Sequence, residues 1–148
     1  MRHASSKAIS EKNLSDVIRK AGFRATTPRL LVLSYLQKSK YPLGIKEILK
    51  GIGQKNIDQV TVYRILDAFK KAGVVVQVDF QQGRALYEFK DHEHDHHHIV
   101  CTSCNKVEDF TGCEYEKLAH KALKQTHGFA KVTSHSLELF GLCAACAK

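Results

Sequence analysis

Apolar residues in the first half of the chain recur at spacings of three and four, which is typical of amphipathic helices. Thr27 as the N-cap residue, with Pro28 at the first helical position, marks the start of the second helix. After Gly73 the spacing changes to the alternation of strands, and Gln81–Gly83 separates two strands as the turn of a β-hairpin. Four helices and two strands are therefore expected, over residues 14–21, 28–36, 45–52, 59–72, 74–80 and 84–89.

Helices followed by a hairpin are typical of winged helix-turn-helix proteins, which place one helix in the major groove of DNA. The stretch that follows is polar and rich in histidine. Beyond it, strands are expected near residues 99–101, 107–110 and 129–140, with a helix over about 114–126. The sequence thus predicts an α+β protein with a flexible N-terminus (1–9), a winged helix-turn-helix DNA-binding domain (10–89), a hinge (90–95) and a small α/β metal-binding domain (96–148).

Composition excludes several classes of protein. Of the 148 residues, 43% are apolar and 26% are charged, which is an ordinary globular balance and excludes wholesale disorder. The chain has no apolar run of about eighteen residues that could cross a membrane. Its N-terminal charges precede no apolar segment of a secretory signal. We therefore expect a cytoplasmic protein.

Charge is distributed unevenly along the chain. Residues 1–84 carry 16 basic and 6 acidic side chains, whereas residues 85–148 carry 7 and 9. A basic N-terminal half suits DNA, and a solvated lysine-rich surface is the alternative. The apolar stripe of the fourth helix runs from Val62 to Phe69 and leaves polar residues on another face. The predicted DNA contacts are Arg24, Thr61, Tyr63 and Arg64.

Four of the five cysteines form two Cys-x-x-Cys pairs, Cys101 with Cys104 and Cys143 with Cys146. In a reducing compartment such pairs indicate metal or redox chemistry rather than disulfides. Neither pair lies in the βαβ pattern of a redox motif. Two thiolate pairs complete a closed tetrahedral shell, which is the arrangement of structural zinc. We therefore predict structural Zn²⁺ bound by all four thiolates.

Histidines gather immediately before the first of these cysteines. If the strand there is extended, successive side chains point to opposite faces, so that His96 and His98 share one face and Asp95 and His97 the other. One strand could then supply two metal sites, and a solvated histidine-rich linker is the alternative. His135 is expected to point inward, as a metal ligand or a core residue. No metal role is expected for His3, Cys113, His120 and His127.

Six motifs follow one another along the chain: Gly22–Arg29, Thr61–Arg64, Gly83 with Tyr87 and Glu88, His96–Cys104, His127–Phe129 and His135–Cys146. In this order they resemble the ferric uptake regulator (Fur) family, over about residues 12–146. The resemblance implies a dimeric, metal-dependent bacterial transcription factor. Its N-terminal winged helix would bind double-stranded operator DNA, and its C-terminal α/β domain would dimerise.

The resemblance also implies two further metal sites. In many members of the family a histidine before the third helix helps to bind the regulatory metal, but Pro42 occupies that position here. This departure predicts a weaker link between the metal and the DNA-binding domain. By position, Glu88, His96, His98 and Asp109 match the regulatory site, and Asp95, His97, Glu116 and His135 match the second site.

Imidazole and carboxylate ligands without a thiolate suit Fe²⁺, Mn²⁺ or Zn²⁺. We predict an iron-sensing repressor of metal-uptake genes that binds Fe²⁺ as its regulatory metal. The alternatives are a zinc- or peroxide-sensing member of the family, with Mn²⁺ or Zn²⁺ in that site, and a DNA-binding protein with structural zinc only. A metal-dependent hydrolase is disfavoured, because the sequence has no Ser, Cys or Thr nucleophile arrangement and its histidine run is joined to a predicted DNA-binding domain. No enzymatic activity and no membrane partner are expected.

Overall fold

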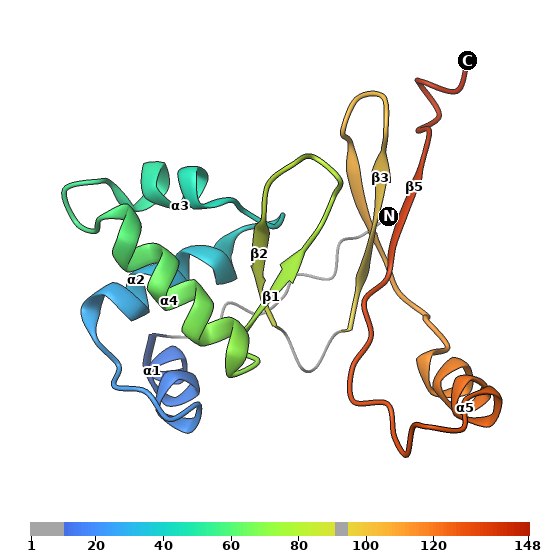
Figure 1. Ribbon diagram of the computed structural model, residues 1–148. Coiled ribbons are helices and arrows are strands. Elements are labelled where there is room, and N and C mark those ends of the chain that lie inside the picture. Colours follow the sequence, from blue (N-terminus) through green and yellow to red (C-terminus); the bar gives the residue numbers. More distant parts are fainter. Residues whose placement is uncertain (1–10, 91–94) are drawn as a thin grey trace. The chain divides into compact units, whose positions relative to one another are not determined.

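The computed structural model describes residues 11–90 and 95–148, and the chain divides into two compact units at residue 91 (Figure 1). The first unit contains four helices and a two-stranded sheet, and the second contains a three-stranded sheet and one helix. This is the predicted α+β class. The predicted flexible N-terminus and positions 91–94 of the predicted hinge lie outside the described residues. Within the described residues, no helix is long and apolar enough to span a membrane.

The first unit is a winged helix-turn-helix fold. Its two strands pair antiparallel, with Val75 opposite Phe89, and form the wing. Leu43 extends this sheet by exchanging two backbone hydrogen bonds of 2.8 Å with Tyr87. The elements are α1 (Glu11–Lys20), α2 (Thr27–Lys38), α3 (Ile45–Ile52), α4 (Gln59–Lys71), β1 (Val75–Val78) and β2 (Leu86–Phe89).

An apolar core holds the first unit together. Its largest fully buried side chain is Phe69 of α4, whose ring contacts that of Phe23 at a centroid distance of 5.9 Å. Val75 and Tyr87 extend this core onto the wing. Each fully buried large apolar side chain contributes about 1.5–3 kcal/mol to the free energy of folding. The apolar faces predicted from the spacing of residues along the helices therefore stabilise this unit. Further members are Leu14, Ile18, Leu33, Leu36, Ile48 and Leu66.

Two local features depend on more than the spacing of apolar residues. Thr26 rather than Thr27 is the N-cap residue of α2, because Thr27 already belongs to the helix. Gly51 lies inside α3, where a Cβ would collide with the ring of Tyr35 from α2. The close approach of α2 and α3 therefore requires glycine at this position.

The second unit is a three-stranded sheet with one helix. β3 is the central strand, with β4 antiparallel on one side and β5 parallel on the other. Figure 1 shows α5 at the opposite end of these strands from the chain's C-terminal turn. The elements are β3 (His97–Cys101), β4 (Val107–Phe110), α5 (Tyr115–Gln125) and β5 (Glu138–Gly141).

The last strand is much shorter than the predicted 129–140. Residues 129–137 have no regular structure, and only Glu138–Gly141 pair with β3. Regular alternation of apolar residues begins only at Leu137, so the preceding stretch has no continuous apolar face to bury. His135 consequently lies in an irregular segment and not in a strand.

Few side chains of the second unit are buried. Among its described residues only His97, His98, Val100 and Cys101 are buried. No residue of α5 is buried. Small domains with so little apolar core commonly need a metal, a disulfide or a partner subunit, so the polar and sulfur-containing residues of this unit merit attention.

Candidate metal centres and nucleic-acid interface

The structure brings the two Cys-x-x-Cys pairs together at one end of the sheet. Cys101 ends β3, and Cys104 follows it in a tight turn. Parallel pairing places Gly141 of β5 beside Cys101, so Cys143 and Cys146 follow at the same end. The four Sγ atoms all lie within 4.8 Å of one another. This cluster contains all four of the predicted zinc ligands.

The sulfur positions fit a zinc ion. Tetrahedral Zn–S bonds of about 2.3 Å put neighbouring sulfurs about 3.8 Å apart. The Sγ atoms of Cys104 and Cys143 are 3.8 Å apart. The backbone N–H of Cys143, 3.4 Å from the Cys101 sulfur, and that of Cys104 lower the pKa of Cys101 to about 6. The backbone N–H of Cys146 lowers the pKa of Cys143. These donors favour the thiolate, which is the form that binds metal.

Repulsion between the thiolates calls for a cation at the centre of the cluster. A hydrogen bond from Ser103 lowers the pKa of Cys146, but the Cys143 and Cys104 sulfurs raise it to about 11. A divalent ion removes this repulsion, because coordination keeps thiols deprotonated. The chemistry of the four donors therefore fits structural zinc.

A histidine–carboxylate cluster lies between β3 and β4. His98 stands opposite Asp109 in the register, with Nε2 3.8 Å from Oδ1. The ring of His96 lies edge-on to that of His98, with centroids 5.2 Å apart. The second unit thus brings together three residues of the predicted regulatory site. Glu88, the fourth, is on β2 of the first unit.

A second cluster gathers around His135. Its Nε2 is 3.3 Å from Nε2 of His97 and 3.9 Å from Oδ2 of Asp95. Since His97 and His98 are adjacent on β3, they point to opposite faces, as the alternation predicts. Cys113 joins this cluster, with its Sγ 3.9 Å from the same His135 nitrogen. Glu116, predicted here, is exposed on α5 and is not among the described residues grouped in the cluster.

Cys113 is the functional candidate that sequence reasoning missed. It has no Cys-x-x-Cys spacing, and it lies 22 positions before His135 in the sequence. Gly112, with a φ of 87°, turns the chain from β4 towards α5 immediately before it. The sequence offered one signal. Cys113 is the one cysteine that belongs to neither Cys-x-x-Cys pair.

The first unit presents α4 as the candidate DNA-reading helix. The hydroxyl of Thr61 donates to Asp58 at 2.6 Å, and its N–H donates to the same carboxylate at 2.9 Å. These bonds lower the pKa of Asp58 and cap the helix. The predicted contact Thr61 is therefore engaged in capping. Tyr63, 57% exposed, and Arg64 project from the exposed face.

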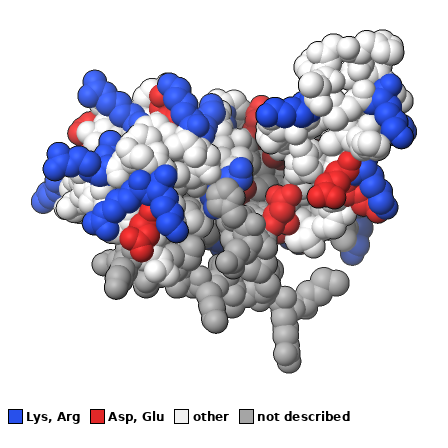
Figure 2. All heavy atoms as spheres, turned by 90° about the horizontal axis from the view of Figure 1, so that it is seen from below, with Lys and Arg blue, Asp and Glu red and all other residues white. Residues whose placement is uncertain are grey.

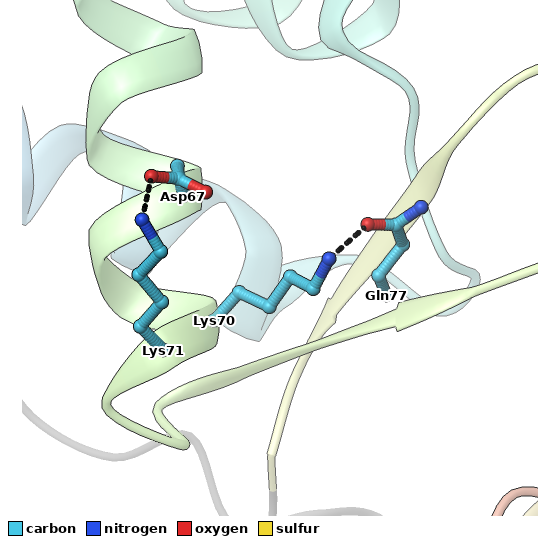
Figure 3. A network of polar contacts seen from close by, with 4 residues as sticks. All are labelled: Asp67, Lys70, Lys71 and Gln77. Atoms are coloured by element: carbon cyan, nitrogen blue, oxygen red, sulfur yellow. Dashed lines mark hydrogen bonds and ion pairs between the residues drawn. The ribbon is translucent and has the colours of Figure 1, made fainter.

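Polar contacts fix the other end of α4. Lys70 Nζ donates to Gln77 Oε1 at 2.8 Å, and Lys71 Nζ donates to Asp67 Oδ2 at 2.9 Å (Figure 3). Exposed contacts of this kind contribute at most about 1 kcal/mol each. The first connects α4 to β1 and adds to the apolar core, which contains side chains of both elements.

A shallow hollow lies between the start of α2 and α4. It is lined by Thr26 and Arg29 on one side and by Thr61 and Arg64 on the other. Arg29 donates to the carbonyl oxygen of Arg24 at 2.9 Å, which fixes its side chain. Sequence reasoning selected the exposed Arg24 and missed Arg29, because only the fold places Arg29 beside Arg64.

Positive charge is concentrated on the first unit. In Figure 2, Lys and Arg side chains project from the helical unit with few Asp or Glu side chains between them, whereas both signs occur on the other unit. This distribution follows the uneven charge of the sequence. Lys and Arg at such a surface suit the phosphates of a nucleic acid.

Known proteins resemble this chain over nearly its whole length. The model of the ferric uptake regulator family matches residues 20–140. The ferric uptake regulation protein of Bordetella parapertussis is 34% identical over 134 residues, covering 88% of this chain and 94% of that protein. The Helicobacter pylori ferric uptake regulator, described as having three functional metal-binding sites, has a TM-score of 0.70 at 28% identity, covering 95% of this chain and 96% of its own.

A third comparison gives the same result. The Vibrio cholerae ferric uptake regulator, described by a structural rearrangement of its DNA-binding domains, has a TM-score of 0.66 at 31% identity. The match covers 87% of this chain and 98% of that one. The chain therefore belongs to the ferric uptake regulator family, whose members are metal-responsive transcription regulators and not enzymes.

Proposed function

We propose that this protein is an iron-responsive repressor of metal-uptake genes that acts in the cytoplasm as a homodimer. The observation that supports iron is the cluster of His96, His98 and Asp109, which has no thiolate among the described residues. Imidazole and carboxylate ligands suit Fe²⁺ and Mn²⁺, whereas a thiolate would favour Zn²⁺. Relatives named as ferric uptake regulators support the same metal.

Two other metal ions have structural roles in this proposal. The cysteine cluster holds Zn²⁺ and fastens β5 to β3. A second ion on the opposite face of β3 from His98, in the cluster around His135, stabilises the dimerisation domain. The three metal-binding sites described for the Helicobacter pylori relative agree with this number.

The first unit binds double-stranded operator DNA through α4. Tyr63 and Arg64 are exposed on this helix, and Arg24 and Arg29 lie at the start of α2. The helix can read base edges in the major groove while the arginines at the start of α2 contact phosphates. The DNA-binding domains described for the Vibrio cholerae relative support this role.

The proposed switch needs ligands from both units. A metal ion can drive DNA binding only as far as it prefers the DNA-competent arrangement. The resemblance assigns Glu88, at the wing, to the regulatory site as its one ligand from the first unit. Pro42 is buried and has no ligating atom where many relatives have a histidine. A single ligand from the first unit predicts a coupling near the lower end of the typical range of about 1–3 kcal/mol.

Dimerisation of the second unit covers apolar side chains that this chain alone leaves exposed. Leu118 of α5 is 64% exposed, Phe129 is 72% exposed and Leu139 of β5 is 43% exposed. No residue of α5 is buried. Several large apolar side chains left exposed in one small domain indicate an interface, and a second copy of the same domain is the partner that the family implies.

Replacing Cys101 by serine is expected to remove the structural zinc and the folded dimer. Loss of one thiolate removes much of the binding free energy, which in such sites is free energy of folding. Metal analysis and size-exclusion chromatography should show neither tight zinc nor dimer for Cys101→Ser. Ala144→Ser, an exposed change between Cys143 and Cys146, is the control and should retain both. Tight zinc retained by Cys101→Ser would contradict the four-cysteine site.

Arg64→Ala is expected to weaken binding to A·T-rich promoter DNA by about 10-fold or more, since losing a base contact costs about 1–3 kcal/mol. Zinc content and dimerisation should not change. Arg19→Ala removes an equal charge from an exposed position on α1 and should have a much smaller effect. Gel-shift titration measures both. Unchanged affinity in Arg64→Ala would place the reading surface elsewhere.

Replacing His96 and His98 together by alanine is expected to abolish the metal response of DNA binding. Under anaerobic conditions Fe²⁺ or Mn²⁺ should strengthen DNA binding by wild type only a few-fold, as the weak coupling predicts. The double variant should show no response and keep its cysteine-bound zinc. His120→Ala, on exposed α5, is the control. Equal metal dependence in wild type and the double variant would refute the site. No response in wild type would leave a DNA-binding protein with structural zinc only.

A further inference from the structure

The cluster around His135 has an unusual composition. Three potential donor atoms lie within 3.9 Å of one nitrogen, His135 Nε2, and together with His135 they come from three separate segments. They are Nε2 of His97 at 3.3 Å, Sγ of Cys113 at 3.9 Å and Oδ2 of Asp95 at 3.9 Å. His97 begins β3, Cys113 is in the connection between β4 and α5, and His135 precedes β5. The fold therefore gathers residues that no sequence spacing relates.

The ligand atoms of His97, Cys113 and His135 all lie within 4.8 Å of one another, and the separations from His135 are close to those of ligands around one tetrahedral ion. Metal–nitrogen bonds of about 2.0–2.1 Å place two nitrogens about 3.3 Å apart, and a sulfur at about 2.3 Å lies about 3.6 Å from each nitrogen. The nitrogen pair matches this value, and the sulfur is a few tenths of an ångström further away. A hydrogen bond between the two imidazoles would explain the first distance but not the approach of a thiol and a carboxylate.

Neighbouring side chains hold the two imidazoles in these positions. The ring of Tyr115 stacks on His135 with a centroid distance of 4.1 Å and an interplanar angle of 16°. Phe110 contacts the ring of His97 at 5.5 Å. The His97 residue is only 7% exposed, so its ring needs a polar partner inside the unit. The donors are thus arranged before any metal binds.

We propose that His97, Cys113 and His135 form a thiolate-containing metal site that selects Zn²⁺. Asp95, whose Oδ2 lies 3.9 Å from His135 Nε2 but outside this group of three, is the nearest carboxylate for a fourth ligand. Cys113 takes the place that the resemblance assigned to Glu116. A thiolate is a soft ligand that favours Zn²⁺ over Fe²⁺ and Mn²⁺, whereas the carboxylate of Glu116 would favour the harder ions. This inference refines the second metal site of the proposed function, but it does not depend on DNA binding or on the identity of the sensed metal.

Cobalt substitution tests this site in the full-length protein. With zinc retained in the four-cysteine cluster, as checked by metal analysis, added Co²⁺ should give the near-ultraviolet charge-transfer absorption of a cobalt–thiolate bond. The histidine–carboxylate cluster has no thiolate and cannot produce this band. Zn²⁺ should displace the bound Co²⁺, whereas Mn²⁺ should not. Absence of the band in the wild-type protein would overturn the proposal.

Two variants identify the ligand. Cys113→Ser should remove the charge-transfer band and weaken zinc binding at this site by at least about 10-fold, because even residues outside the ligand shell change metal affinity by about 10–100-fold. Glu116→Gln should leave both unchanged. Cys113→Asp, which keeps a ligating oxygen, should still bind metal but without the band and with reduced preference for Zn²⁺ over Mn²⁺.

The opposite result would refute the assignment. Weaker zinc binding in Glu116→Gln, with the band and affinity unchanged in Cys113→Ser, would show that Glu116 and not Cys113 is the ligand, as the resemblance implies. Because both readouts measure metal binding, a protein that fails to bind DNA can still confirm this site. Conversely, a protein that binds DNA in response to metal can lack the cobalt–thiolate band, which would refute this site alone.

Discussion

The four-cysteine cluster is the constraint on which the second unit depends. Parallel pairing of β5 with β3 places the C-terminal cysteine pair beside the first pair, although 38 residues lie between Cys104 and Cys143. Burial of a side chain such as Val100 contributes about 1.5–3 kcal/mol, and few other apolar residues here are buried. Structural zinc in small domains contributes roughly 10–16 kcal/mol. The metal therefore outweighs the apolar core in this unit.

β3 connects this structural cluster to the two histidine clusters. Cys101 ends the strand, while His97 and His98 at its start point to opposite faces. One short strand therefore contributes ligands to all three groups, and a change in its position would alter them together. The first unit is different, because its buried helices and wing residues form a core of their own. Metal dependence is thus expected mainly in the half of the chain that lacks such a core.

The sequence predicts most of the fold because its signals are local. Helical spacing, the hairpin turn and the Cys-x-x-Cys pairs each involve residues near one another in the chain. Non-local features were not predictable in the same way. The glycine at position 51 is explained only by the nearby ring of Tyr35. Arg29 becomes a candidate DNA contact only because the fold places it in the same hollow as Arg64. Cys113 approaches His135 only in the folded second unit.

Hydrogen exchange with and without zinc tests the role of the cysteine cluster most directly. When a chelator removes the metal, the backbone amides of β3, β4 and β5 are expected to lose protection together. The amides of α1 to α4 should keep theirs, because the core of the first unit includes no metal ligand. Restoring Zn²⁺ should restore protection in the sheet. Unchanged protection of β3 and β5 in zinc-free protein would contradict the conclusion that the cluster organises this unit.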